Sequence, residues 1–178
     1  MTSIRDPDEA RRVHLDQSLV ALEVVRRFSG PIIDVGSGGG APGIPLAAAL
    51  PDRQVTLLEA NGRKCAFLRE AAAEFPNVTV AQGRAEEQET DRFGVAVAKA
   101  LAQPPVAAEW CLPLVAPGGA VILYVGPSAD VAEASRVSGL LGGGPAEQAP
   151  GLVVLPKLER TPSGFPRRPG LAKKRPLA

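Results

Sequence analysis

The residues best suited to hold a small ligand form one stretch, residues 34–43, with the sequence DVGSGGGAPG. It places the carboxylate of Asp34 directly before a run of glycines. Glycines let the backbone adopt positive φ angles and approach a ligand closely. The stretch follows a short apolar run, and the loop after the first strand of a doubly wound sheet is a common ligand crevice. The pattern therefore predicts a binding loop, with a purely structural turn as the alternative.

The charge of Asp34 separates two candidate ligands. Gly38, Gly40 and Gly43 match the spacing of a dinucleotide fingerprint, so the glycines alone fit an NAD-dependent oxidoreductase as well. A carboxylate before the loop would repel a diphosphate. S-adenosylmethionine has no phosphate and carries an ammonium group, which a carboxylate attracts. We therefore expect Asp34 and Gly38 to bind S-adenosylmethionine.

Two further positions suit the nucleoside part of this ligand. Glu59 ends the second apolar run, about twenty residues after the loop, where an acidic residue can accept hydrogen bonds from ribose hydroxyls. Ala85 and Glu86 follow the third apolar run, at the same edge of the expected sheet, and are placed to meet an adenine ring. The alternatives are a solvated surface carboxylate at Glu59 and a polar helix start at Ala85.

Short apolar runs alternate with helical stretches along the chain. Strands are expected at 31–35, 54–59, 77–81, 93–98, 120–125 and 151–155, and helices at 6–28, 44–50, 62–75, 104–114 and 129–141. This alternation predicts an α/β fold with a doubly wound, mostly parallel sheet. We divide the single domain into an N-terminal helical segment (1–30), a cofactor-binding part (31–156), and a final strand with a basic proline-rich tail (157–178). Residues 142–145 (GGGP) are expected to form a flexible connection.

Charge is distributed unevenly. The net charge is +1, but residues 157–178 contain seven Lys/Arg and one Asp/Glu, a surplus of +6, which leaves −5 for the rest. The prolines should keep this tail extended, so that its cations can follow a polyanion such as a phosphate backbone in a salt-dependent way. The alternative is a tail packed back on the sheet by Phe165 and Leu171. The candidate residues for this contact, and for RNA binding where the polyanion is RNA, are Arg160, Arg167, Arg168, Lys173, Lys174 and Arg175.

Other classes of site find little support. Cys65 and Cys111 are far apart and match no metal spacing, which favours buried free thiols and no metal site. His14 is the only histidine and has no evident catalytic partner, and Trp110 is expected in the core. The polar N-terminus does not resemble a signal peptide, and no apolar run reaches the length of a membrane span, so a cytoplasmic protein is expected.

Four stretches resemble the RsmG family (glucose-inhibited division protein B), bacterial guanine-N7 methyltransferases of 16S ribosomal RNA. The extension after the glycine loop and the tail are the most specific of them, and the likeness spans nearly the whole chain. The stretches are TSIRDP (2–7) leading to His14, IDVGSG (33–38) through PGIPL (42–46), GRAE (83–86), and TP (161–162) through FPRRPG (165–170) to KRPL (174–177).

The resemblance implies a class I methyltransferase fold with cofactor contacts at Gly36, Ala41, Ala85 and Glu86. It also points to Lys99, where the family usually has an arginine that contacts the cofactor. The implied substrate is guanine 527, in the decoding-region loop of 16S ribosomal RNA, and the implied partner is this RNA or the small ribosomal subunit, with a monomeric enzyme expected. Guanine N7 has a free lone pair, so methylation removes no proton from it. No catalytic residue is therefore named, and rate enhancement should come from proximity and orientation.

The chain departs from the family pattern at several positions. Family members usually have further helices before the TSIRDP segment. The usual HLLDSL reads HLDQSL (14–19), which places Gln17 where the aspartate is expected, Lys99 replaces the arginine, and Val125 stands where a lysine is frequent. These departures leave an alternative open: a divergent or inactive paralogue that acts as a small-molecule methyltransferase or as an RNA-binding protein.

Overall fold

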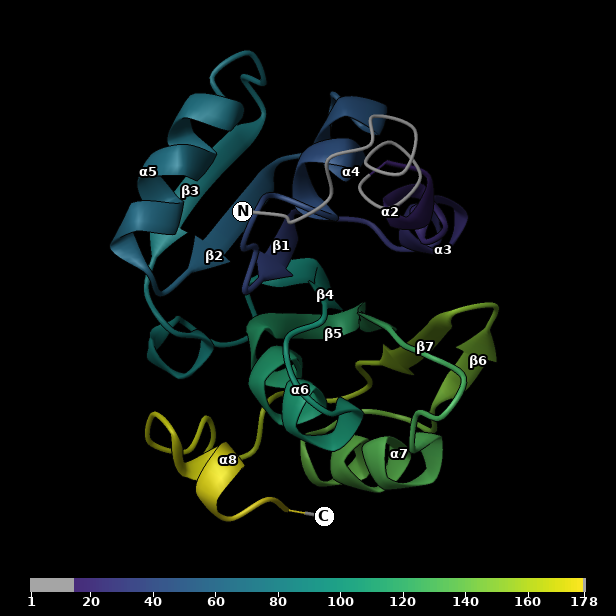
Figure 1. Ribbon diagram of the computed structural model, residues 1–178. Helices are drawn as coiled ribbons and strands as arrows, with labels where there is room; N and C mark the ends of the chain where they lie inside the picture. Colours follow the sequence, from purple (N-terminus) through teal and green to yellow (C-terminus); the bar gives the residue numbers. More distant parts are fainter. Residues whose placement is uncertain (1–14, 178) are drawn as a thin grey trace.

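Seven strands form one sheet in the order β3-β2-β1-β4-β5-β7-β6 in the computed structural model (Figure 1). It describes residues 15–177, so the predicted helix start at Asp6 and the role of His14 lie outside the described residues. The strands β1 to β5 pair in parallel, whereas β7 is antiparallel to both β5 and β6. This confirms the doubly wound, mostly parallel sheet. The strands are β1 (Ile32–Val35), β2 (Val55–Glu59), β3 (Val78–Gln82), β4 (Phe93–Lys99), β5 (Val115–Tyr124), β6 (Glu147–Ala149) and β7 (Leu152–Pro156).

Helices cover both faces of the sheet (Figure 1). On one face lie α2 (Gln17–Leu19), α3 (Leu22–Arg26), α4 (Gly43–Ala49) and α5 (Gly62–Ala71), and on the other lie α6 (Pro104–Cys111), α7 (Val131–Leu140) and α8 (Leu171–Lys174). Two short 3-10 helices, η2 (Ala85–Glu87) and η3 (Leu112–Leu114), join strands to their neighbours. None of the helices within residues 15–177 is long and apolar enough to cross a membrane.

Strand alternation divides the core into two layers. Ile32 packs with the α4 and α5 side, and its neighbour Ile33 packs with the α6 and α7 side. Because the central strands are buried on both faces, nearly every residue in them is apolar, as expected for a covered parallel sheet. Asp34 is the exception within β1, since it is fully buried and shares the face of Ile32.

The N-terminal helical segment is interrupted. The predicted helix over 6–28 is, in its described part, two short helices separated at Val20 and Ala21. The hydroxyl of Tyr124 donates to the carbonyl of Ser18 in α2, just before this interruption, and Ser18 is buried there. A tertiary contact with β5 thus supplies a partner for a backbone group near the break.

The connection over residues 142–145 is packed, contrary to the flexible linker predicted from its glycines. The amide of Gly143 donates to the carbonyl of Ser138 at 2.8 Å, and Gly143 forms a bridge with Lys157. A Cβ added at Gly143 would lie 2.1 Å from the Ser138 hydroxyl. These glycines therefore serve close packing. Within residues 157–177 the Gly143–Lys157 bridge is the only strand-like pairing. The final strand predicted for that part is therefore not found there, and the last strand along the chain is β7, which ends at Pro156.

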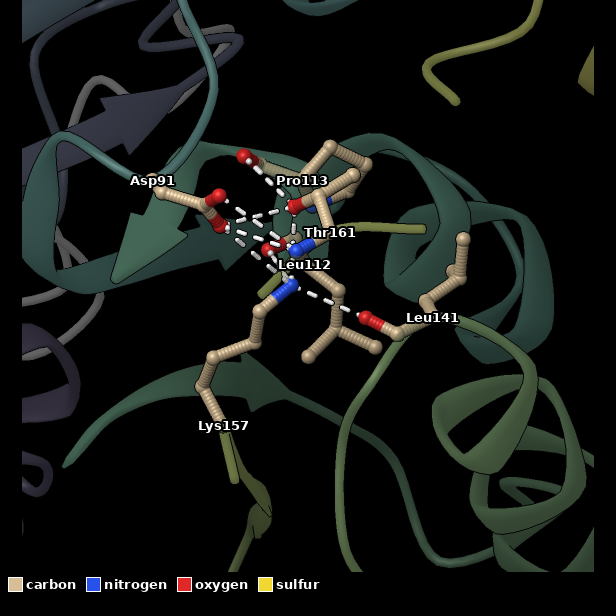
Figure 2. Close-up of polar contacts among 6 residues, drawn as sticks. All are labelled: Asp91, Leu112, Pro113, Leu141, Lys157 and Thr161. Carbon is tan, nitrogen blue, oxygen red and sulfur yellow. Dashed lines mark hydrogen bonds and ion pairs between the residues drawn. The ribbon is translucent and has the colours of Figure 1, made fainter. Parts of the chain in front are cut away.

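A buried lysine joins three parts of the chain (Figure 2). The Lys157 ammonium donates to the carbonyls of Leu112 at 3.1 Å and Leu141 at 2.8 Å, which are the C-terminal caps of α6 and α7. It also donates to the Thr161 hydroxyl at 2.9 Å and lies 3.7 Å from the Asp91 carboxylate. Burial lowers the pKa of Lys157, and Asp91 opposes this. A cation at two helix C-termini satisfies carbonyls that have no partner within their helices.

The segment after this lysine folds back on the sheet. Residues 161–177, which we call the C-terminal segment, contain α8, and the extended conformation predicted for the tail is wrong over that part. Phe165 and Leu177 pack against the core, and Ala172 is buried in it. The alternative of a tail packed back on the sheet is therefore the one the structure adopts. Apolar residues between the cations account for this, because burying them favours docking.

Candidate functional site

The glycine loop after β1 is held by backbone hydrogen bonds to β2. The amides of Gly36 and Ser37 both donate to the carbonyl of Leu58, at 2.8 and 3.1 Å. Gly36 has a φ of +73°, and a Cβ added there would lie 2.5 Å from the Leu101 side chain. Only glycine fits at this position. The loop therefore presents its backbone at the carboxyl end of β1, as the sequence predicted.

Asp34 lies behind this loop and lines no described cavity. One carboxylate oxygen accepts a hydrogen bond from the amide of Gly43 at 3.0 Å, at the start of α4. Burial raises the pKa of Asp34 to about 7, and the Gly43 hydrogen bond opposes this rise only in part. A Cβ at Gly43 would lie 2.7 Å from the same carboxylate oxygen. The structure thus uses Asp34 to fix the far end of the loop, and its predicted contact with a cofactor ammonium stays a prediction.

Glu59 connects the glycine loop to the next strand. One of its carboxylate oxygens accepts from the amide of Gly38 at 3.0 Å, and the other accepts from the amide of Asn61 at 2.9 Å. Asn61 in turn caps α5 through its side chain. A carboxylate has about four lone-pair positions. Two of them therefore remain for a ligand, and the predicted contact of Glu59 with a ribose stays a prediction.

A cavity of about 280 Å³ opens at this carboxyl edge of the sheet. Among the predicted cofactor residues it brings together Gly36, Glu59, Ala85 and Glu86. Its other lining residues come from the strand ends, from the loop after β4, and from the C-terminal half. They include Lys64, Arg84, Ala100, Leu101, Trp110 and Lys173. The volume is near the lower end of that of small-molecule sites.

Two lining residues of this cavity were assigned elsewhere by the sequence. Trp110 of α6 belongs to the core, as predicted, and also borders the cavity. The Lys173 ammonium, predicted to bind RNA, lies 5.2 Å from the centre of the Trp110 ring. The amide of Gly170 donates to the Glu86 carboxylate at 3.0 Å. No spacing rule relates α6 to a segment sixty residues later, so only the fold brings these groups to one place.

The remaining predicted cofactor residues lie beside the cavity. Gly38 and Ala41 are partly buried in the loop and line none of the described cavities. Lys99, at the end of β4, borders a neighbouring hollow of about 500 Å³, and burial lowers its pKa. Ala100 lines both this hollow and the first cavity, and its φ is +54°. The two hollows therefore meet at Ala100.

Two departures from the family pattern contact each other. The Lys99 ammonium donates to the Gln17 side-chain oxygen at 3.4 Å. The family resemblance places aspartate and arginine at these positions, which would form an ion pair in the same geometry. Here a lysine contacts a neutral amide, so the pair carries a net charge of +1 where the family pattern would sum to zero, and the hydrogen bond loses the assistance of a second charge.

The candidate RNA-binding residues fall into two groups. The Arg167 guanidinium forms a bidentate ion pair with the buried Glu109 of α6, with both N–O distances at 2.6 Å. The others are exposed: Arg160, Arg168, Lys173, Lys174 and Arg175. Arg167 is thus engaged within the chain, and the exposed cations remain available to a polyanion.

The cysteines and the possible metal ligands offer no further site. Cys65 and Cys111 are buried free thiols, as predicted. Burial, with the nearby charge of Asp34, raises the pKa of Cys111, which makes it unreactive. No group of three or more His, Cys, Asp or Glu side chains with metal-binding geometry occurs in the part of the chain that the structure describes.

A family model described as rRNA small subunit methyltransferase G (GidB) matches residues 1–137. The chain is a member of this family. Relatives named ribosomal RNA small subunit methyltransferase G include one from Moorella thermoacetica, 36% identical, and one from Synechococcus elongatus, 37% identical. Each alignment covers 99% of this chain and 82% of the relative. Membership makes this chain an S-adenosylmethionine-dependent methyltransferase, in agreement with the loop and with Glu59.

Solved structures give the same fold. A SAM-dependent O-methyltransferase from Thermotoga maritima superposes with a TM-score of 0.63 at 18% identity, covering 91% of this chain and 69% of that one. The CurJ carbon methyltransferase superposes with a TM-score of 0.66 at 12% identity, covering 86% of this chain and 59% of that one. At these identities the likeness extends to the fold alone. It confirms the doubly wound sheet predicted from the strand and helix alternation and the class I methyltransferase fold that the family resemblance implies.

Proposed function

We propose that this enzyme transfers a methyl group from S-adenosylmethionine to N7 of a guanine in 16S ribosomal RNA, the family's guanine in the decoding-region loop. The observation that carries the proposal is the cavity at the carboxyl edge, bordered by Gly36 and Glu59, in a chain of the rRNA small subunit methyltransferase G family. The exposed cations around the C-terminal segment support an RNA substrate, since they suit a phosphate backbone.

The residues of the cavity suit the methyl donor. Glu59 keeps two lone-pair positions for ribose hydroxyls, and the Gly36 backbone allows close approach of the methionine part. Ala85 and Glu86 border the end expected to receive adenine. We propose that Asp34 contributes through the loop that it fixes, and that its charge favours an ammonium group nearby. When bound, the donor supplies an electrophilic methyl group.

The neighbouring hollow suits the acceptor base. It meets the cofactor cavity at Ala100, and it is bordered by Lys99, Tyr124 and Val20. A base held there would face the donor across this shared edge, and Lys99 would stand beside both ligands. Guanine N7 attacks with its own lone pair, so the protein needs to align the two partners and exclude water, and no proton acceptor at N7 is required.

Two experiments test this function. Calorimetry should detect binding of S-adenosylhomocysteine, and the purified enzyme should methylate 16S ribosomal RNA or small subunits in the presence of S-adenosylmethionine. Deleting the gene should remove one 7-methylguanosine from 16S RNA, as measured by mass spectrometry of its nucleosides. An unchanged nucleoside profile would refute the proposal.

The contact between Arg167 and Glu109 favours a second candidate, a divergent paralogue that methylates a small molecule or binds RNA without catalysis. This contact engages Arg167, one of the cations predicted to bind RNA. In addition, Gln17 and Lys99, which depart from the family pattern, border the second hollow. Cofactor binding without activity on RNA would favour the small-molecule enzyme. RNA binding with no affinity for S-adenosylhomocysteine would favour the non-catalytic protein.

A further inference from the structure

The C-terminal segment is attached to α6 by one buried ion pair. Arg167 meets Glu109 through two hydrogen bonds of 2.6 Å, and the Glu109 carboxylate is 4% exposed. The same guanidinium donates to the carbonyl of Arg175 at 2.9 Å, which closes the segment on itself around α8. A bidentate pair of this kind fixes both orientation and distance. The position of α8 therefore depends on this pair.

The ion pair lies next to the cofactor cavity. Trp110 follows Glu109 directly in α6, and its ring borders the cavity. On the other side of the pair, α8 carries Lys173, whose ammonium lies 5.2 Å from the centre of that ring. Gly170, between Arg167 and α8, donates its amide to the carboxylate of Glu86, a third residue of the cavity wall. One side of the cavity is thus built by a segment that no cofactor motif contains.

We propose that Arg167 and Glu109 are positioning residues for the cofactor site, because they hold Lys173 and Gly170 against the cavity wall. The inference rests on the proposed assignment of this cavity to S-adenosylmethionine. Docking of the segment and occupancy of the cavity are then linked, and each favours the other to the same degree. Arg168, Lys174 and Arg175 of the same segment are exposed, so RNA that binds them acts on the element that carries Lys173.

The only tryptophan of the chain is Trp110, which makes it a reporter for this wall. In Arg167→Met the segment should detach, and the emission of Trp110 should shift to the red because water replaces the cover over the ring. The affinity for S-adenosylhomocysteine should fall about tenfold, within the range usual for coupled sites. Arg92→Met is a matched control. Arg92 is exposed and directly precedes β4, at the end of that strand away from the cofactor cavity. Its one ion pair among the described residues is with the exposed Glu89. This variant should change neither readout.

A second variant covers the case in which Arg167→Met does not fold, as judged by circular dichroism. Lys173→Ala removes the side chain over Trp110 and leaves the ion pair intact, and it should shift the emission to the red and weaken S-adenosylhomocysteine binding several-fold. Glu109→Gln should weaken binding in the wild-type background but add little in the Arg167→Met background, because both act through one contact.

The outcomes separate this inference from the proposed function. Wild-type emission and wild-type affinity in folded Arg167→Met, or in Lys173→Ala, would overturn the positioning role while leaving the methyltransferase intact. If the wild-type protein bound no S-adenosylhomocysteine, the cofactor assignment would fail, and the Trp110 emission of ligand-free variants would still decide whether the ion pair holds the wall.

Discussion

Replacing Asp34 by asparagine should change how the stability of this protein depends on pH. Burial raises the pKa of Asp34 from its usual 3.8 to about 7 in the folded protein. The folded state therefore holds this proton more tightly than the unfolded state. The contribution of Asp34 to stability is complete below about pH 4 and is lost as the pH rises to 7. Three pKa units correspond to about 4 kcal/mol, at 1.36 kcal/mol per unit.

The substitution Asp34→Asn removes this ionisation and keeps an oxygen that can accept the hydrogen bond from Gly43. The asparagine amide takes the place of an oxygen that interacts with the Ser37 side chain, and a hydrogen bond lost there costs about 1–3 kcal/mol at every pH. The informative quantity is therefore the change in the free energy of unfolding with pH, and not its value at a single pH. The variant should gain about 4 kcal/mol relative to wild type between pH 4 and pH 8. Urea unfolding followed by circular dichroism measures this, and parallel profiles for the two proteins would refute the reasoning.

The same group allows a test of its predicted role toward the cofactor. At pH 7 a carboxyl with a pKa of about 7 is half protonated. An ammonium bound nearby lowers this pKa, so S-adenosylhomocysteine should release about half a proton on binding to wild type and fewer on binding to Asp34→Asn. Calorimetry in buffers of different ionisation enthalpy counts these protons. Equal proton release by both proteins would place the ammonium away from Asp34.

Three further substitutions have defined outcomes. Gly43→Ala places a Cβ 2.7 Å from the Asp34 carboxylate, and thermal unfolding should show a loss of about 1–3 kcal/mol. Glu59→Gln keeps the size of the side chain but removes charge-assisted hydrogen bonds, so calorimetry should show about tenfold weaker binding of S-adenosylhomocysteine. Lys157→Met leaves the Asp91 carboxylate without its buried cation and should cost about 3 kcal/mol in urea unfolding.

Each of these has a result that would contradict it. Wild-type melting of Gly43→Ala would show that the loop tolerates a Cβ. Glu74→Gln, at an exposed position in the turn after α5, is the matched control for Glu59→Gln, and equal effects of the two would deny Glu59 a specific role. A Lys157→Met variant as stable as wild type would mean that water or another group replaces the ammonium at the two helix ends.

The central strands of the sheet could be predicted because they are apolar on both faces and are separated by helices, whereas the polar edge strand β6 was not predicted. The placement of Glu59, Ala85 and Glu86 in one cavity follows from the same pattern, since parallel strands bring their carboxyl ends to one edge. The glycines of residues 142–145 misled the prediction. They allow close packing, Gly143 against Ser138 and Gly142 against the backbone after Lys157, which depends on where α7 ends and which composition cannot show.

The orientation of the Asp34 side chain and the docking of the tail were harder to predict from the sequence. Asp34 lies on the same face of β1 as Ile32, which is the face covered by α4. The alternation of side chains along a strand could have placed its carboxylate on that face. The pair of Glu109 and Arg167 has no local signal, because its members are 58 residues apart. The basic composition of the tail is visible in the sequence, whereas its docking depends on an acidic partner that only the fold supplies.

The buried ammonium of Lys157 decides where the chain can be shortened. A fragment that ended before this residue would contain every strand of the sheet, yet the carbonyls at the ends of α6 and α7 would lose their common donor. The hydroxyl of Thr161, which bridges the ammonium to Asp91, extends this dependence by four residues. Any cut before Thr161 would therefore report on folding, and a cut just after it would still remove Arg167 from the buried Glu109. Charge-removing substitutions at Arg168, Lys174 and Arg175 are thus the cleaner probe of RNA binding by the basic segment.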